Sequence, residues 1–306
     1  MGCLKEALFV LLFPLGTSSA WAQSLGEMPL APEGDGPGGP EALAFDGRNI
    51  WVARPFADTL VKLSARNGDH AGAFRVERPG AVLFAFAHLW VANTRASKIL
   101  KINPSDGKLV ASFGVGEAPA AIVSDGEHLW VANSGANSVT KLDRNGRKLL
   151  IVGVQARPFA LAYDGANVWV ANSKSRSVTK VRARDGQVVK TFPVGDGPAA
   201  LAFDGEHIWV ANYFSGNVMK LRAGDGERVG TYPTADGAAG LAFDGNNIWV
   251  TSASTNRVMA LRKDGSVMAS YATGLRPHQV LFDGANIWLA NAASDSVSST
   301  ALGLHR

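Results

Sequence analysis

An apolar run that contains a tryptophan and ends on a small residue recurs along the 306-residue chain. The tryptophans of these runs are spaced 39, 40, 39, 40, 40 and 39 residues apart. A regular period near 40 residues is typical of proteins built from repeated structural units. The period therefore predicts seven repeats. Their tryptophans are Trp51, Trp90, Trp130, Trp169, Trp209, Trp249 and Trp288.

The fifth repeat shows how each unit can fold. Apolar residues fill positions 199–203 and 208–211, and mixed apolar and polar residues fill 218–221 and 228–232. Asp-Gly, which is favoured in tight hairpin turns, stands between the first two runs and between the last two. Gly and Asp-Gly interrupt the chain about every ten residues, which excludes a helical solenoid. Four strands per repeat predict an all-β fold, a seven-bladed β-propeller with four antiparallel strands in each blade.

The same pattern predicts which strands contact water. The first two runs of each repeat are almost wholly apolar, so we expect both of their faces to be buried. The third and fourth runs mix Lys, Arg and Thr with apolar residues, so we expect one wet face on each. Two residues before each tryptophan stands His or Asn, and because both tolerate positive φ we interpret this as a turn position. The histidines at that position are His88, His128 and His207.

The two ends of the chain predict how the ring closes. The last repeat stops soon after the run at residues 296–300, before a fourth strand can form. Residues 23–39 form an extended, Gly- and Pro-rich segment before the first repeat, which starts near Pro40. We therefore expect part of residues 24–31 to supply the outer strand that blade seven lacks, which removes a free sheet edge. The propeller itself then occupies residues 40–306.

Residues 1–22 are typical of a secretory signal peptide. Lys5 precedes an apolar segment at residues 7–15, and Ala-Trp-Ala at residues 20–22 fits a cleavage site. The apolar segment is shorter than the roughly 20 residues that span a bilayer, and no later segment is long and apolar enough. The one cysteine, Cys3, lies within the signal, which leaves the mature chain without a thiol. We expect a periplasmic or extracellular protein, cleaved near Ala22 and monomeric.

The repeats resemble a known family. Residues 130–133 (Trp-Val-Ala-Asn) with 138–142 (Ser-Val-Thr-Lys-Leu), and residues 169–172 with 177–181, are similar to the YVTN family of 40-residue β-propeller repeats. The resemblance covers residues 40–300. It implies an exported seven-bladed propeller, with binding roles in some members.

The repeat length and number are also similar, more distantly, to those of the virginiamycin B lyase group. That resemblance implies a metal-assisted lyase with His and Glu on one face, and His278 matches such a histidine. The position three residues after each tryptophan, where that comparison requires Glu, holds Asn in five repeats. Arg54 and Ser252 occupy it in the other two, and these are the first positions to examine for function.

Variable loops carry the candidate binding residues. The loop after the second strand and the junction between blades share the face around the mouth of the channel. Arginine recurs in both, and guanidinium groups bind carboxylate or phosphate in a bidentate manner, while aromatic rings stack on sugars or bases. We therefore predict a ligand or partner at the channel mouth, and the arginines favour an anionic one. The candidates are Glu41, Arg54, Arg78, Asn93, Arg95, Arg157, Tyr213, Phe214, Arg276 and His278, and the same loops carry Phe56, Phe159, Lys174 and Arg176.

Charge and motifs limit the other function classes. The net charge of +4 makes acidic partners plausible, but the basic residues lack the clustering of a dedicated nucleic-acid binder, so nucleic acid stays a minor alternative. No nucleophile elbow, zinc-peptidase motif, phosphate loop or dinucleotide fingerprint occurs, and the Asp-Gly turns lack the spacing of a calcium loop. We predict non-catalytic binding with no cofactor and no metal. The alternatives are a lyase or hydrolase that uses His278 as acid or base, and a cell-envelope scaffold.

Overall fold

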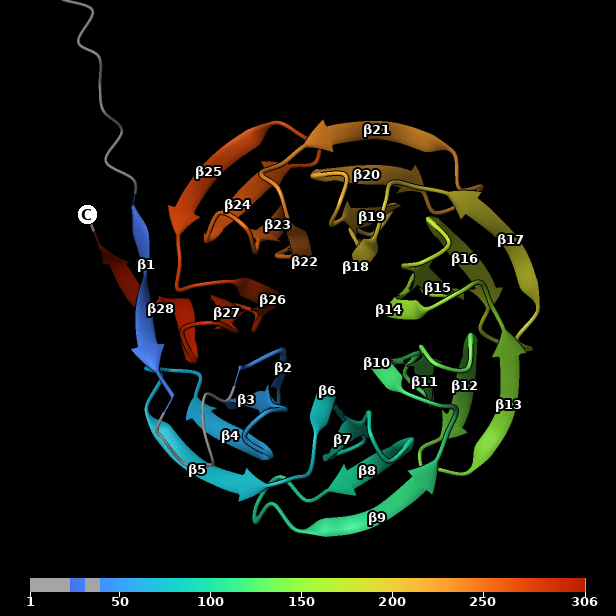
Figure 1. Cartoon of the computed structure of the whole chain (residues 1–306), viewed down its shortest axis with the longest axis horizontal. Helices are drawn as coiled ribbons and strands as arrows, with labels where there is room; N and C mark the ends of the chain where they lie inside the picture. The colour runs from blue at the N-terminus through green and yellow to red at the C-terminus, as the bar shows by residue number, and fades with distance from the viewer. Residues whose placement is uncertain (1–22, 31–38, 306) are drawn as a thin grey trace, which may run out of the picture.

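The computed structural model describes residues 23–30 and 39–305, so the predicted signal peptide lies outside the described residues. The strands form a ring of four-stranded antiparallel units, each with its first strand nearest the centre (Figure 1). The described part of the chain contains no helix, and therefore none that could cross a membrane. The all-β architecture and the repeated four-strand units predicted from the sequence are confirmed.

The strands follow one another in a constant order, and their bounds repeat with the period of the sequence. In chain order they are β1 (Ser24–Pro29), β2 (Ala42–Phe45), β3 (Asn49–Arg54), β4 (Thr59–Ser64), β5 (His70–Arg75), β6 (Pro79–Ala85), β7 (His88–Asn93), β8 (Lys98–Ile102), β9 (Leu109–Gly114), β10 (Pro119–Ser124), β11 (His128–Asn133), β12 (Ser138–Asp143), β13 (Lys148–Gly153), β14 (Pro158–Tyr163), β15 (Asn167–Asn172), β16 (Ser177–Arg182), β17 (Val188–Pro193), β18 (Pro198–Phe203), β19 (His207–Asn212), β20 (Asn217–Arg222), β21 (Arg228–Pro233), β22 (Ala238–Phe243), β23 (Asn247–Ser252), β24 (Arg257–Arg262), β25 (Val267–Ala272), β26 (Pro277–Phe282), β27 (Ile287–Asn291) and β28 (Ser296–His305).

The ring closes where the two ends of the chain meet. Strand β1 pairs antiparallel with β28, which places Glu27 opposite Ser298 and Met28 opposite Val297. Ser24 also lies beside Ala272 of β25, so β1 joins the units β22–β25 and β26–β28 into one eight-stranded sheet. The other twenty strands form five separate four-stranded sheets. Strand β1 thus comes from the segment that was expected to complete the last unit.

The recurrent tryptophans lie between neighbouring units. Trp169 on β15 is completely buried and packs in one cluster with Ile208 and Val210 of the next unit. Its ring stacks on Phe192 of β17, with the two centroids 5.6 Å apart. The small residue two positions after each tryptophan, Ala171 in this unit, leaves room for the neighbouring sheet. Each tryptophan therefore belongs to the interior of the ring.

In five units a lysine on the third strand links the tryptophan to the following unit, whereas Ala260 and Ser299 stand opposite Trp249 and Trp288. Lys180 Nζ lies 5.1 Å from the Trp169 ring centroid and donates hydrogen bonds to the carbonyls of Ala223 (2.6 Å) and Gly224 (2.9 Å). Thr179 and Lys180 are 1 % and 7 % exposed, so the wet face expected on the third strand is wrong. The lysine stem lies along the indole, and its charge is satisfied by backbone carbonyls. The wet face of the fourth strand is present, for example at Leu109 and Ile151.

The carboxylates of the Asp-Gly turns accept hydrogen bonds from the tryptophan side chains. Asp204 Oδ1 accepts the backbone N–H groups of Glu206 and His207, and Oδ2 accepts the indole N–H of Trp209 at 2.8 Å. The positive φ of this turn, 96°, belongs to Gly205, and the backbone of His207 stays in the strand region. The positive φ expected at the His/Asn position is therefore wrong. The position is structural for another reason, because its N–H binds the turn carboxylate.

We expect the Asp204 turn to make folding stability depend on acid pH. Burial alone would raise the pKa of the Asp204 carboxyl, but hydrogen bonds from Trp209, Glu206 and His207 lower that pKa below its ordinary 3.8. Such a carboxylate contributes stability that is present above pH ~4 and is lost as the pH falls through the lower, folded-state pKa. The Asp204→Asn variant should have a lower free energy of unfolding than wild type at pH 6. This difference should become smaller as the pH falls to 2.5. A constant deficit across urea titrations in this range would contradict the assignment.

Candidate functional site

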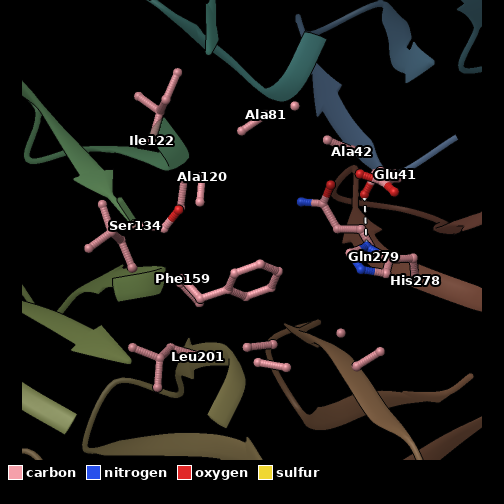
Figure 2. A pocket seen from close by; sticks show the side chains of 18 of the residues that line it. Glu41, Ala42, Ala81, Ala120, Ile122, Ser134, Phe159, Leu201, His278 and Gln279 are labelled. Carbon is pink, nitrogen blue, oxygen red and sulfur yellow. Dashed lines mark hydrogen bonds between the residues drawn. The ribbon is translucent and has the colours of Figure 1, made fainter. Parts of the chain in front are cut away.

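The inner strands begin with a ring of residues that surrounds one mouth of the central channel. These residues line an inner cavity of about 360 Å³. Most of them are Gly or Ala, which keeps the channel open. Figure 2 shows the Phe159 ring extending into the cavity, with Glu41 and His278 on another side of it. The mouth residues, in chain order, are Glu41, Gly80, Ala120, Phe159, Ala199, Ala239 and His278.

Two side chains on β26 connect the last unit to the first across the channel wall. His278 Nδ1 lies 3.1 Å from the Glu41 carbonyl oxygen, and Gln279 Oε1 accepts the N–H of Leu43. A carbonyl oxygen can only accept, so Nδ1 of His278 is the donor. Nε2 has no hydrogen-bond partner among the described residues. His278 is thus held by the scaffold through one nitrogen and has the other for a ligand.

A second cavity of about 400 Å³, the outer cavity, adjoins the inner one. The two cavities share Arg157, Phe159, Ala199, Ala239 and His278. Basic and aromatic side chains are gathered in the outer cavity, as the loops of units β14–β17 and β18–β21 meet the junction before β26. The further lining residues of these kinds are Lys174, Arg176, Tyr213, Phe214 and Arg276.

Positive charge dominates the outer cavity. Four cationic side chains line it against one carboxylate, that of Asp196, which pairs with Arg176 at 2.9 Å. Within the described residues, the side chains of Arg157, Lys174 and Arg276 form no ion pair. Three cations that converge on a hollow attract anions and raise their local concentration. The cavity is therefore electrostatically suited to an anionic ligand.

Two of these arginines have an unusual backbone conformation. Arg157 has φ 57° and Arg276 has φ 55°, in the left-handed region, directly before the prolines that start β14 and β26. The same position has positive φ in every other unit, at Gly39, Arg78, Ala118, Gly197 and Gly237. A side chain there costs about 1–2 kcal/mol relative to glycine. The conformation is a feature of the repeated scaffold, and it places the two arginine side chains at the edge of the outer cavity.

Six of the ten predicted site residues line the two cavities. They come from the units β2–β5, β14–β17 and β18–β21 and from the start of β26. The cavities thus bring together residues that are far apart in the sequence. These six are Glu41, Arg157, Tyr213, Phe214, Arg276 and His278.

The other four candidates lie outside both cavities. Arg54 is completely buried and binds Asp295 with two nitrogens, Nε at 3.2 Å and Nη2 at 2.6 Å. Asn93 is buried and its side-chain oxygen accepts the N–H of Ala96. Arg78 lies over the Phe56 ring at 5.3 Å, and Arg95 lines neither cavity. The position three residues after the tryptophan thus points into the scaffold, and Ser252 at the same position is also buried.

Sequence reasoning did not single out Gln279, although a signal for it exists. The second residue of the channel wall is alanine or glycine in every other unit, as at Ala81, Ala200 and Gly240. A long polar side chain among small ones marks a departure from the scaffold pattern. Gln279 lines the inner cavity and hydrogen-bonds across the closing junction.

The residues around His278 do not form a metal site. Among residues 23–30 and 39–305, no group of three or more His, Cys, Asp or Glu side chains could hold a metal ion. Of the described residues, His278 is the one histidine that lines either cavity, and Glu41 and Asp196 are the carboxylates that do so. A catalytic metal usually has three protein ligands. The described residues supply no such group of three ligands at one point.

Comparisons with known proteins relate the chain to solved propellers only. No protein-family model matches it, and no curated protein matches it. A streptogramin B lyase structure is 17% identical, with a TM-score of 0.79 over 94% of this chain and 99% of that one. A catalytically inactive virginiamycin B lyase from Staphylococcus aureus with quinupristin is 16% identical, with a TM-score of 0.78 over 93% and 99%. Hydrazine synthase from Kuenenia stuttgartiensis is 19% identical, with a TM-score of 0.77 over 87% and 96%. Such low identities show a shared β-propeller fold alone.

Proposed function

We propose that this chain is an exported, seven-bladed β-propeller that binds an anionic ligand at its channel mouth without chemical conversion. The blade count follows when the eight-stranded sheet is divided into β22–β25 and β26–β28 with β1. Export rests on the signal-peptide pattern at residues 1–22. The binding role rests on the outer cavity, where Arg157, Lys174 and Arg276 converge without a carboxylate partner among the described residues.

Two alternatives are weaker. A lyase that works through His278 would agree with the names of two similar structures, but the described residues around it supply no group of three metal ligands. A passive envelope scaffold does not account for Arg157, Lys174 and Arg276, which line one cavity without an ion-pair partner among the described residues. Binding of an anion accounts for this charge.

The test is anion binding with a matched charge control. We expect 2-naphthalenesulfonate, measured by isothermal titration calorimetry, to bind wild type and to lose affinity as salt rises, because exposed charges are screened. Arg157→Ala and Arg276→Ala should each weaken binding about ten-fold, since a hydrogen bond to a charged group contributes about 1.5–3 kcal/mol. Arg228→Ala removes the same charge at the start of β21, outside both cavities, and should leave affinity unchanged.

Two results would count against the proposal. One is an affinity that is independent of both arginines and of salt. The other is an equal loss in Arg228→Ala, which would indicate a general effect of net charge.

A further inference from the structure

We propose that the ligand is a planar aromatic anion, seated in the outer cavity with its ring against Phe214 and its charged group between Arg157 and Arg276. This inference rests on the proposed anion-binding function and adds the chemical class of the ligand. Its basis is the asymmetry of the outer cavity, which has a floor of small residues, aromatic side chains in its wall and unpaired cations.

The outer cavity lies where small residues stand among large ones around the mouth of the channel. Unit β22–β25 contributes Ala239 and Ala253 to the lining. At the equivalent positions β14 has Phe159, β18 has Ala199 and the loop after β19 has Tyr213. The small and large side chains together surround a cavity about 400 Å³ in volume. Small-molecule sites usually range over ~300–1,000 Å³, so a two-ring acid fits.

The aromatic part of the wall presents a free ring. Phe214 is 75% exposed, and its ring meets Tyr213 edge-on with centroids 5.1 Å apart. The ring lies close against Gly197, where a Cβ atom would come within 2.5 Å of Phe214 Cδ2. The backbone of Gly197 therefore supports the ring, which remains open to the cavity. An exposed aromatic side chain beside unpaired cations is a surface that can stack on another ring.

The chain contains its own control for this residue. Phe56 stands five residues after Trp51, as Phe214 stands five after Trp209, and it lies against Gly39 in the same way, with a Cβ to Cδ2 separation of 2.9 Å. Arg78 covers the Phe56 ring, and Phe56 lines neither cavity. Phe56 and Phe214 share a local structure, but only Phe214 lines the outer cavity.

The experiment compares two acids of the same charge and similar size. Calorimetric titrations of the full mature protein would use 2-naphthoate, its saturated analogue decahydro-2-naphthoate, and inorganic phosphate. We expect 2-naphthoate to bind at least five-fold more tightly than the saturated acid, as stacking on an aromatic side chain contributes that much or more. Phe214→Ala should remove this preference, and Phe56→Ala should preserve it.

The outcomes separate this inference from the proposed function. If both acids bind equally and Arg157→Ala weakens both, the site takes anions without regard to aromaticity, and the present inference is overturned while the function stands. If Phe56→Ala and Phe214→Ala act alike, stacking in the outer cavity is also excluded. If none of the three anions binds, both proposals fail. Melting temperatures of the variants show whether each has kept its fold, and Phe214→Leu provides a second, apolar but non-aromatic variant.

Discussion

Replacing Trp169 with alanine is expected to lower the free energy of unfolding by about 3–5 kcal/mol, the usual cost of deleting a buried tryptophan. The indole is completely buried, stacks on Phe192 and fills the space between two units. Its N–H also binds Asp164 Oδ2 at 2.7 Å, so the substitution removes a donor from that carboxylate. Lys180 loses the ring along which it reaches the next unit. One substitution thus weakens contacts within a unit and between units.

Urea unfolding at neutral pH, followed by far-UV circular dichroism, measures this loss. Phe214→Ala is the matched aromatic control, because its ring is 75% exposed and its removal should change stability by less than about 0.5 kcal/mol, as at other surface positions. Near-wild-type stability of Trp169→Ala would show that the repeated tryptophans do not hold the units together.

Removal of residues 23–30, which contain β1, is expected to lower the melting temperature by about 10–20 °C. Leu25 and Leu30 are 2% and 5% exposed, and burial of each leucine contributes about 1.5–3 kcal/mol. A change of 1 kcal/mol corresponds to roughly 2–4 °C in a domain of this size. The deletion also exposes the hydrogen-bonding edge of β28, which pairs with β1 in the intact chain. An open edge promotes association between copies.

Differential scanning calorimetry of a mature chain that starts at residue 31 measures the effect of the deletion. A point variant tests the same strand without shortening the chain. A Cβ atom at Gly26 would lie 2.5 Å from the Leu302 carbonyl oxygen, so Gly26→Ala should displace β1 from β28. Gly114→Ala, on an outer strand with nothing within 4 Å of the added atom, is its control. An unchanged melting temperature in the deletion would mean that β1 contributes nothing to closure.

Several features of the scaffold were readable in the sequence because they depend on local chemistry repeated many times. The tryptophan period predicted the four-strand units, and Asp-Gly predicted the turns. The truncated last repeat predicted that a strand from the N-terminal segment would be needed. Errors arose where a side chain acts beyond its own unit. Lys180 is polar in sequence, yet the next unit covers it and supplies its acceptors, which no pattern within one repeat indicates.

The candidate site was predicted only in part, because the pattern within one repeat does not show contacts between repeats. The sequence placed variable arginines and aromatics on one face, and six of the ten candidates do line a cavity. Arg54 was chosen because it departs from Asn, but its buried position is shared by all units, and Asp295 from the other end of the chain compensates its charge. The hydrogen bond between Arg54 and Asp295, which are 241 residues apart, shows that this arginine belongs to the scaffold and not to the surface. The sequence does not show this pairing.

By itself, the sequence determined the repeating unit, its strand order and the face that carries variable loops, because hydrophobic period and turn chemistry act over a few residues. Tertiary structure alone decided which loops meet. Arg157 and Arg276 lie 119 residues apart in the chain and line one cavity because the ring curves. Side chains of the intervening units, with small ones such as Ala239 and Ala253 among them, surround that cavity, which is a property of the closed ring.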